Sequence, residues 1–265
     1  VYQAFLDQAA AGNGAAGQII RPLRVIMPLY NEEIYFIARA DSPLQFVHEI
    51  KDARLNVGPL GSGTAMSATT LYRQLFGTAS PEATTSYLSN EDALVKLTGD
   101  KSVDVVVVVA GQPAKLLADM KPEARGLVKL LRFDAEHPSS KAALGTYVRA
   151  TIRAASYPNL LSEDLPGLAV QAYLVTYDYN RSATVSTMTR FARSLCQNFA
   201  TLQAKGHPKW REVQLAVPEL KAGWRYYPPT QRELASCLAR PSSRQPARPP
   251  AKACTQQERV LGLCG

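Results

Sequence analysis

Apolar residues along the chain alternate between short continuous runs and longer segments with helical spacing. The short runs predict β-strands at residues 23–29, 34–39, 54–58, 103–109, 128–134 and 167–178. The longer segments predict helices over residues 65–76, 90–98 and 185–204. Asn90 is the expected N-cap of the second helix, and Gly206 with Pro208 should end the third. Strands that alternate with helices predict an α/β fold with a largely parallel sheet.

Two loops are the first candidates for a ligand site. In parallel α/β sheets, ligands bind beyond the carboxyl ends of the strands. The loop GPLGSGT, residues 58–64, follows one predicted strand, and AGQP, residues 110–113, follows another. In the second loop, an amide side chain directly after a buried strand indicates a ligand contact at Gln112.

The chemistry of the first loop favours an anion. Its glycines can adopt positive φ, and Ser62 and Thr64 add hydroxyl groups. Free amides at a helix start, together with the helix dipole, attract a carboxylate or a phosphate. Known phosphate motifs do not fit, because Thr64 follows Gly63 without an intervening lysine and Met66 stands where the dinucleotide motif needs glycine. A tight turn that only caps the helix is the alternative interpretation.

The sequence contains no recognisable set of catalytic residues. Ser62 lacks the G-x-S-x-G context of a nucleophile, since residue 60 is leucine. The three histidines, His48, His137 and His207, have no neighbours that suggest a triad. We therefore expect a binding protein rather than an enzyme, without cofactor or metal. A transferase or hydrolase that binds phosphate at this loop, and a sensor or scaffold domain, stay open as alternatives.

Composition and charge narrow the class of partner. The chain has 265 residues, 46% of them hydrophobic, and a net charge of +8. A tail from Leu238 to Cys254 supplies four of these charges and contains no aromatic residue, so nucleic-acid binding is not expected. The longest apolar run, Val103 to Ala110, is too short to cross a bilayer. A start at Val1 suggests a processed protein or a fragment.

The four cysteines lie in the C-terminal third and lack metal-type spacing. They fit an oxidising compartment, with Cys196–Cys237 and Cys254–Cys264 as the preferred pairs. A buried thiol on a helix is the alternative for Cys196.

Three segments of the chain match a known sequence pattern: LYNEEIYFIARADSPLQFVHEIKDARLNVGPLGSGT (29–64), YLSNEDALVKLTGDKSVDVVVVVAGQP (87–113) and YVRATIRAASYPNL (147–160). Together they resemble the TAXI-type solute receptors of TRAP transporters. The resemblance covers residues 29–213 and implies a type II periplasmic binding fold, with two α/β lobes that close over a small organic anion. It also implies a periplasmic or extracytoplasmic monomer that delivers an acidic amino acid or dicarboxylate to a TRAP-type membrane permease.

The resemblance also assigns ligand-binding residues. The carboxylate-holding loop corresponds to Gly61, Ser62, Gly63 and Thr64, and the second loop to Gly111, Gln112 and Pro113. Tyr30 and Glu32 lie where the first crossing strand approaches the cleft, and Tyr157 matches a later tyrosine of the family. Arg149 is a further candidate, independent of the resemblance.

Two departures from the family pattern shape the expected domains. The chain starts where members have already completed part of the first lobe, so this lobe is expected to be N-terminally incomplete. Residues 1–34 and 151–238 would form what is present of it, residues 35–150 the second lobe, and residues 239–265 a basic tail. IRAASYP, residues 152–158, lacks the usual proline and glycine before the tyrosine.

Overall fold

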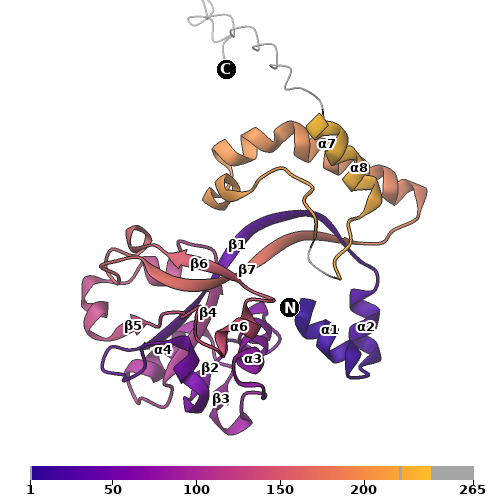
Figure 1. Ribbon diagram of the computed structural model, residues 1–265. Helices are drawn as coiled ribbons and strands as arrows, with labels where there is room; N and C mark the ends of the chain where they lie inside the picture. Colours follow the sequence, from indigo (N-terminus) through magenta and orange to yellow (C-terminus); the bar gives the residue numbers. More distant parts are fainter. Residues whose placement is uncertain (1, 221–222, 240–265) are drawn as a thin grey trace, which may run out of the picture.

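One mixed β-sheet organises the protein, and two of its strands are much longer than the others (Figure 1). The computed structural model describes residues 2–220 and 223–239. The strand order is β3-β2-β4-β1-β7-β6, with β5 paired to the end of β1. The strands are β1 (Leu23–Arg39), β2 (Leu55–Asn56), β3 (Thr85–Ser86), β4 (Val105–Ala110), β5 (Val128–Leu130), β6 (Val148–Ile152) and β7 (Leu165–Tyr177).

The α-helices are α1 (Tyr2–Ala10), α2 (Gly14–Ile20), α3 (Gly63–Phe76), α4 (Asn90–Thr98), α5 (Lys115–Ala118), α6 (Ser140–Ala143), α7 (Ser182–Lys205) and α8 (Pro228–Ala239). Short 3-10 helices are η1 (Val47–Asp52), η2 (Glu82–Thr84), η3 (Pro122–Gly126), η4 (Ala154–Ser156) and η5 (Pro208–Glu212).

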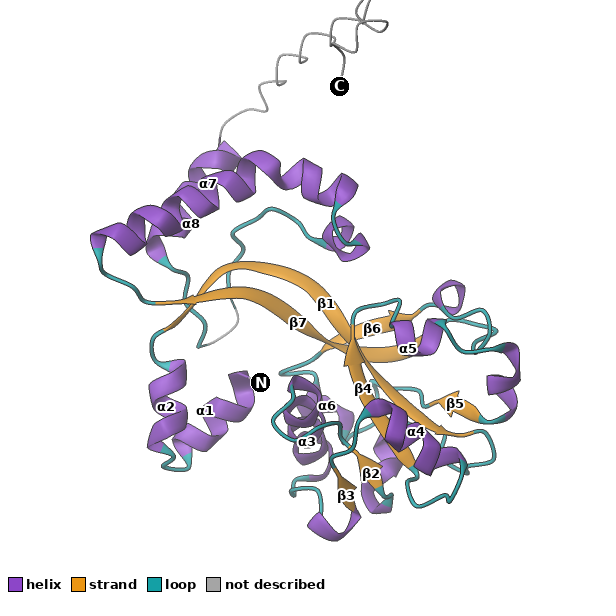
Figure 2. Cartoon of the chain, turned by 180° about the vertical axis from the view of Figure 1, so that it is seen from behind, coloured by secondary structure: helices purple, strands orange, loops and turns teal. Residues whose placement is uncertain are grey.

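The long strands β1 and β7 join two bodies (Figures 1 and 2). The compact body contains β2 to β6 and α3 to α6, whereas α7 and α8 pack on the first half of β1. Two predicted strands, residues 23–29 and 34–39, thus form the single strand β1. The expected domain boundary at residue 34 falls within it. The α/β fold with two lobes connected by crossing strands agrees with the sequence-based expectation.

The expected largely parallel sheet was wrong in its strand directions. β1 pairs antiparallel with β4, β5 and β7, and β6 pairs antiparallel with β7. Only the pairs β2–β3 and β2–β4 are parallel among the described strands. The valine run of β4 shows that both faces of this strand are buried by helices. Helices can bury both faces whether the neighbouring strands are parallel or antiparallel, so the run does not determine strand direction. Val105 and Val107 pack toward α3, and Val106 and Val108 toward α4.

The expected N-cap of α4 was wrong by one residue. Ser89, rather than the expected Asn90, caps α4, because the Ser89 side chain accepts a hydrogen bond of 3.1 Å from Asp92 N. Asn90 is instead the first residue of the helix. Both residue types are good caps, so the sequence alone did not separate two adjacent candidates.

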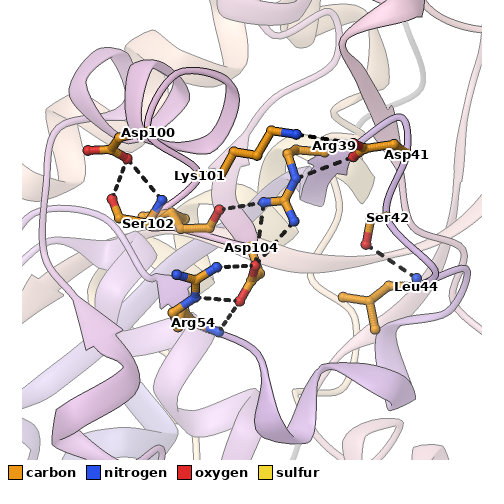
Figure 3. Close-up of polar contacts among 10 residues, drawn as sticks. Arg39, Asp41, Ser42, Leu44, Arg54, Asp100, Lys101, Ser102 and Asp104 are labelled. Carbon is orange, nitrogen blue, oxygen red and sulfur yellow. Dashed lines mark hydrogen bonds and ion pairs between the residues drawn. The ribbon is translucent and has the colours of Figure 1, made fainter.

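A charge network fixes the start of β4 to its two neighbours (Figure 3). Both carboxylate oxygens of Asp104 accept from Arg54, which precedes β2, at 2.7 and 2.8 Å. Arg39 at the end of β1 lies 3.4 Å from the same carboxylate and donates to Val103 O at 3.0 Å. Hydrogen bonds from Arg54 lower the pKa of Asp104 to about 2.

A disulfide joins the two long C-terminal helices. Cys196 of α7 bonds to Cys237 of α8, which confirms the first expected pair. The expected Cys254–Cys264 pair and, apart from Ala239, the basic tail lie outside the described residues.

Candidate functional site

The glycine loop is shaped by backbone geometry that only glycine adopts readily. Gly58 has φ of 83° and Gly61 has φ of 77°, while Gly63 opens α3 with helical geometry. A Cβ on Gly58 would lie 3.1 Å from the Thr64 side chain, so the turn and the helix start fit closely. Ser62 caps α3, since its Oγ accepts from Ala65 N at 3.0 Å. The capping role expected as the alternative is therefore present at Ser62.

A cavity of about 740 Å³ begins at this helix start. Its walls come from α1 and α2, from α3 and the segment after α6, and from the crossing strands β1 and β7. Three expected ligand residues line it: Glu32, Gly63 and Thr64. The other lining residues are Tyr2, Phe5, Ile19, Ile20, Leu23, Ser67, Thr70, Val109, Gly145, Thr146, Tyr147, Val170, Gln171, Ala172, Tyr173, Val175 and Trp224.

Hydroxyl groups of α3 face this cavity in a row. Thr64, Ser67 and Thr70 follow one another at intervals of three residues, which places them on one side of the helix. Ser67 and Thr70 are each only 4% exposed. No hydrogen bond to either hydroxyl is found within the described part of the chain, and neither hydroxyl is among its fully buried polar atoms that lack a partner, so both are open to the cavity. Hydroxyl groups that are open to the cavity and form no bond within the protein are available to a polar ligand.

The amides at the start of α3 complete this wall. Gly63 and Thr64 lie in the first turn, where backbone N–H groups have no intrahelical acceptor. The partial positive charge of the helix end adds to their attraction for an anion. The wall can thus hold a carboxylate through backbone amides and hydroxyl groups.

Glu32 is the charged residue of the cavity wall in the described ranges. Its carboxylate forms no hydrogen bond or ion pair with another described side chain. Burial raises the pKa of Glu32, and the neighbouring Glu33 raises it further, whereas Lys209 lowers it. The Glu32 carboxylate, which forms no ion pair with a described side chain, therefore lies in a partly desolvated place.

The second loop has a different environment from the one we expected. Gln112 is 5% exposed, and its side chain accepts from Arg153 N at 2.7 Å and donates to Thr151 O at 3.3 Å. These bonds tie the loop to β6 and use the amide that we expected to meet a ligand. Gly111, Gln112 and Pro113 do not line the cavity.

Beside this loop lies a buried ion cluster that the sequence analysis missed. Lys209 of η5 is 2% exposed, and its Nζ lies 3.4 Å from the Glu33 carboxylate and 2.8 Å from that of Glu212. It also donates to Asn31 O at 3.1 Å. Glu33 accepts from Gln112 N at 2.8 Å. Burial raises the pKa of Glu33, and Lys209 opposes this shift.

Three further candidates lie away from the cavity lining. Tyr157 is 1% exposed; its hydroxyl accepts from Ala114 N at 2.8 Å and lies 2.7 Å from that of Tyr35. Arg149 is at the surface and pairs with Glu136 at 3.0 Å. Tyr30 lies with its ring 5.8 Å from Lys209 Nζ. Burial raises the pKa of both Tyr35 and Tyr157.

Only some of the cavity residues that the sequence analysis missed have a signal in the local sequence pattern. The spacing of Thr64, Ser67 and Thr70 was visible once α3 was predicted. Tyr173 and Trp224 are brought to the cavity by the tertiary fold, so no local sequence pattern identifies them.

Neither a metal-binding cluster nor a membrane-spanning helix is found among residues 2–220 and 223–239. No group of three or more His, Cys, Asp or Glu side chains there is arranged to hold a metal ion. None of the helices within residues 2–220 and 223–239 combines the length and the apolar character that a bilayer-spanning helix needs.

Two bodies joined by the crossing strands β1 and β7 define a two-lobed α/β protein, the fold class expected from the sequence. The chain belongs to the NMT1-like family, whose sequence profile matches residues 1–218. No curated protein matches it significantly.

Two solved structures are similar in part. One is a TctC solute-binding protein from Polaromonas, with 18% identity, 56% of this chain covered and a TM-score of 0.31. The other is the periplasmic sulfonate-binding protein SsuA from Methylobacillus flagellatus, with 9% identity, 79% covered and a TM-score of 0.39. The match covers 49% of the first protein and 51% of the second, so this chain spans about half of each. The cavity, rather than these likenesses, carries the functional proposal below.

Proposed function

We propose that the protein is an extracytoplasmic solute-binding receptor, and that it captures a small carboxylate for a membrane transporter. The observation that carries the proposal is the cavity wall at α3. There, the amides of Gly63 and Thr64 and the cavity-facing hydroxyls of Ser67 and Thr70 line the same wall. Membership of the NMT1-like family and the two-lobed fold support a binding role rather than catalysis.

The partner and compartment belong to the same proposal. By resemblance to TAXI-type receptors, the transporter would be a TRAP-type permease and the receptor a monomer. The Cys196–Cys237 disulfide supports an oxidising, extracytoplasmic compartment. The division into lobes at residues 34, 150 and 238 is kept as part of this proposal.

The carboxylate wall is tested by comparing threonine variants on one helix. Thr64→Ala should weaken binding of a copurified acid, identified by native mass spectrometry, about ten-fold to a hundred-fold. This is the range for loss of a hydrogen bond to a charged group. Thr64→Ser keeps the hydroxyl and should bind nearly as the parent does. Titration calorimetry gives the affinities.

Thr69→Ala is the matched control. Thr69 lies on the same helix, but its hydroxyl donates to Ala65 O at 2.8 Å and the residue does not line the cavity. It should leave the affinity unchanged. Equal affinity in the parent, Thr64→Ala and Thr64→Ser would show that this hydroxyl does not contact the ligand.

A further inference from the structure

Two adjacent glutamates on β1, Glu32 and Glu33, have very different surroundings. Successive side chains of a strand point to opposite faces, so Glu32 and Glu33 diverge. Glu33 faces Lys209, Gln112 N and the loop after β4. Glu32 faces the cavity, and no described side chain forms an ion pair with it. The fold thus neutralises one carboxylate and leaves the other to the cavity.

Lys209 forms an ion pair with Glu33 but none with Glu32. Its Nζ already contacts Glu33, Glu212 and Asn31 O, and its position is fixed by near-complete burial. An unpaired carboxylate in a partly desolvated site is costly. A cationic group on a ligand would therefore form a favourable ion pair with Glu32.

Aromatic rings form another part of the cavity wall. Trp224 stacks on Tyr2 with ring centroids 3.8 Å apart and lies 4.9 Å from the ring of Tyr173. All three residues line the cavity together with Glu32. Aromatic faces attract ammonium groups through their quadrupole, and they also cover the apolar body of a ligand.

We propose that Glu32 is the recognition group for a protonated amine, so that the ligand carries an ammonium group as well as a carboxylate. This inference rests on the proposed function, because it places the ligand's acidic end at the start of α3. A dicarboxylate would bring its second negative charge into the same cavity as Glu32 and would be disfavoured by repulsion.

The test uses three probes of the same shape that differ in charge: phenylalanine, 3-phenylpropanoate and phenethylamine. Titration calorimetry should show that phenylalanine binds the parent protein most tightly. Glu32→Gln should weaken phenylalanine and phenethylamine about ten-fold to a hundred-fold, and it should not weaken 3-phenylpropanoate. Glu82→Gln, a change at an exposed site in η2, is the control and should alter none of the three.

The outcomes separate this inference from the proposed function. If Glu32→Gln weakens phenethylamine while Thr64→Ala leaves every probe unchanged, the amine site stands and the carboxylate site fails. If Thr64→Ala weakens 3-phenylpropanoate but Glu32→Gln leaves both amines unchanged, the amine site is overturned. Failure of both amines to bind the parent protein overturns it as well. Melting curves confirm that each variant folds, and Glu32→Asp, which keeps the charge, should retain amine binding if Glu32→Gln unfolds.

Discussion

At the scale of single residues, Gly111 makes room for Lys209. A Cβ at residue 111 would lie 2.9 Å from Lys209 Cε and 3.4 Å from its Cγ. Lys209 has little freedom to move, because it is buried and bonded to Glu33, Glu212 and Asn31. The glycine that we expected to hold a ligand thus has a clear structural role.

We expect Gly111→Ala to lower the free energy of unfolding by about 1–3 kcal/mol, the usual cost of overpacking. The added methyl group would push Lys209 away from Glu33 and leave a buried carboxylate poorly paired. Urea denaturation measures the change. Gly126→Ala is the control, since a Cβ there meets nothing within 4 Å. A Gly111→Ala protein as stable as Gly126→Ala would mean that Lys209 relocates without loss.

At the scale of elements, Asp104 connects the starts and ends of three strands (Figure 3). Its carboxylate holds Arg54 before β2 and Arg39 at the end of β1, directly before β4 begins. The pKa of Asp104 falls from the usual 3.8 to about 2, chiefly through hydrogen bonds from Arg54. The charged form of Asp104 therefore stabilises the folded protein.

This shift gives a pH dependence of known sign. Because the folded pKa is the lower one, the stabilisation is present above about pH 4 and is lost as the pH falls through about 2. Asp104→Asn should lower stability at pH 6 by on the order of 1 kcal/mol, allowing for solvent screening, and the difference should shrink toward pH 2. Urea denaturation of both proteins across this range measures it. A difference independent of pH would contradict the role of the charge.

At the scale of the whole molecule, the disulfide determines how firmly α8 is held to α7. The bond between Cys196 and Cys237 closes a loop with a sequence separation of 41 residues. The two helices also share an apolar cluster through Leu195, Phe199 and Leu234. The compact body has separate clusters of its own, on the two faces of β4.

We expect replacement of both cysteines, Cys196→Ala with Cys237→Ala, to cost about 2–4 kcal/mol, as is typical for a native disulfide. Limited proteolysis should then cut near α8 earlier than in the parent, while the compact body should resist as before. Ser186→Ala, at an exposed position of α7, is the control. Equal cutting rates would show that apolar packing alone holds α8.

The amino-acid pattern by itself determined the principal elements, because periodicity and turn residues are local properties. The valine run of β4, the helix after Gly61 and the helix over residues 185–204 all followed from such signals. The pattern also located the helix start that lines the cavity. Residue type was enough at Gly58 and Gly61, where positive φ requires glycine.

Only the tertiary structure decided the strand directions, the partners of charged groups and the use of each candidate residue. Glu32 and Glu33 are indistinguishable in sequence, yet one meets Lys209, 176 residues along the chain, and the other meets the cavity. Gln112 and Tyr157 likewise form bonds within the protein that no local pattern encodes. The physical reason is that these roles depend on contacts between segments far apart in the sequence, whereas secondary structure depends mainly on near neighbours.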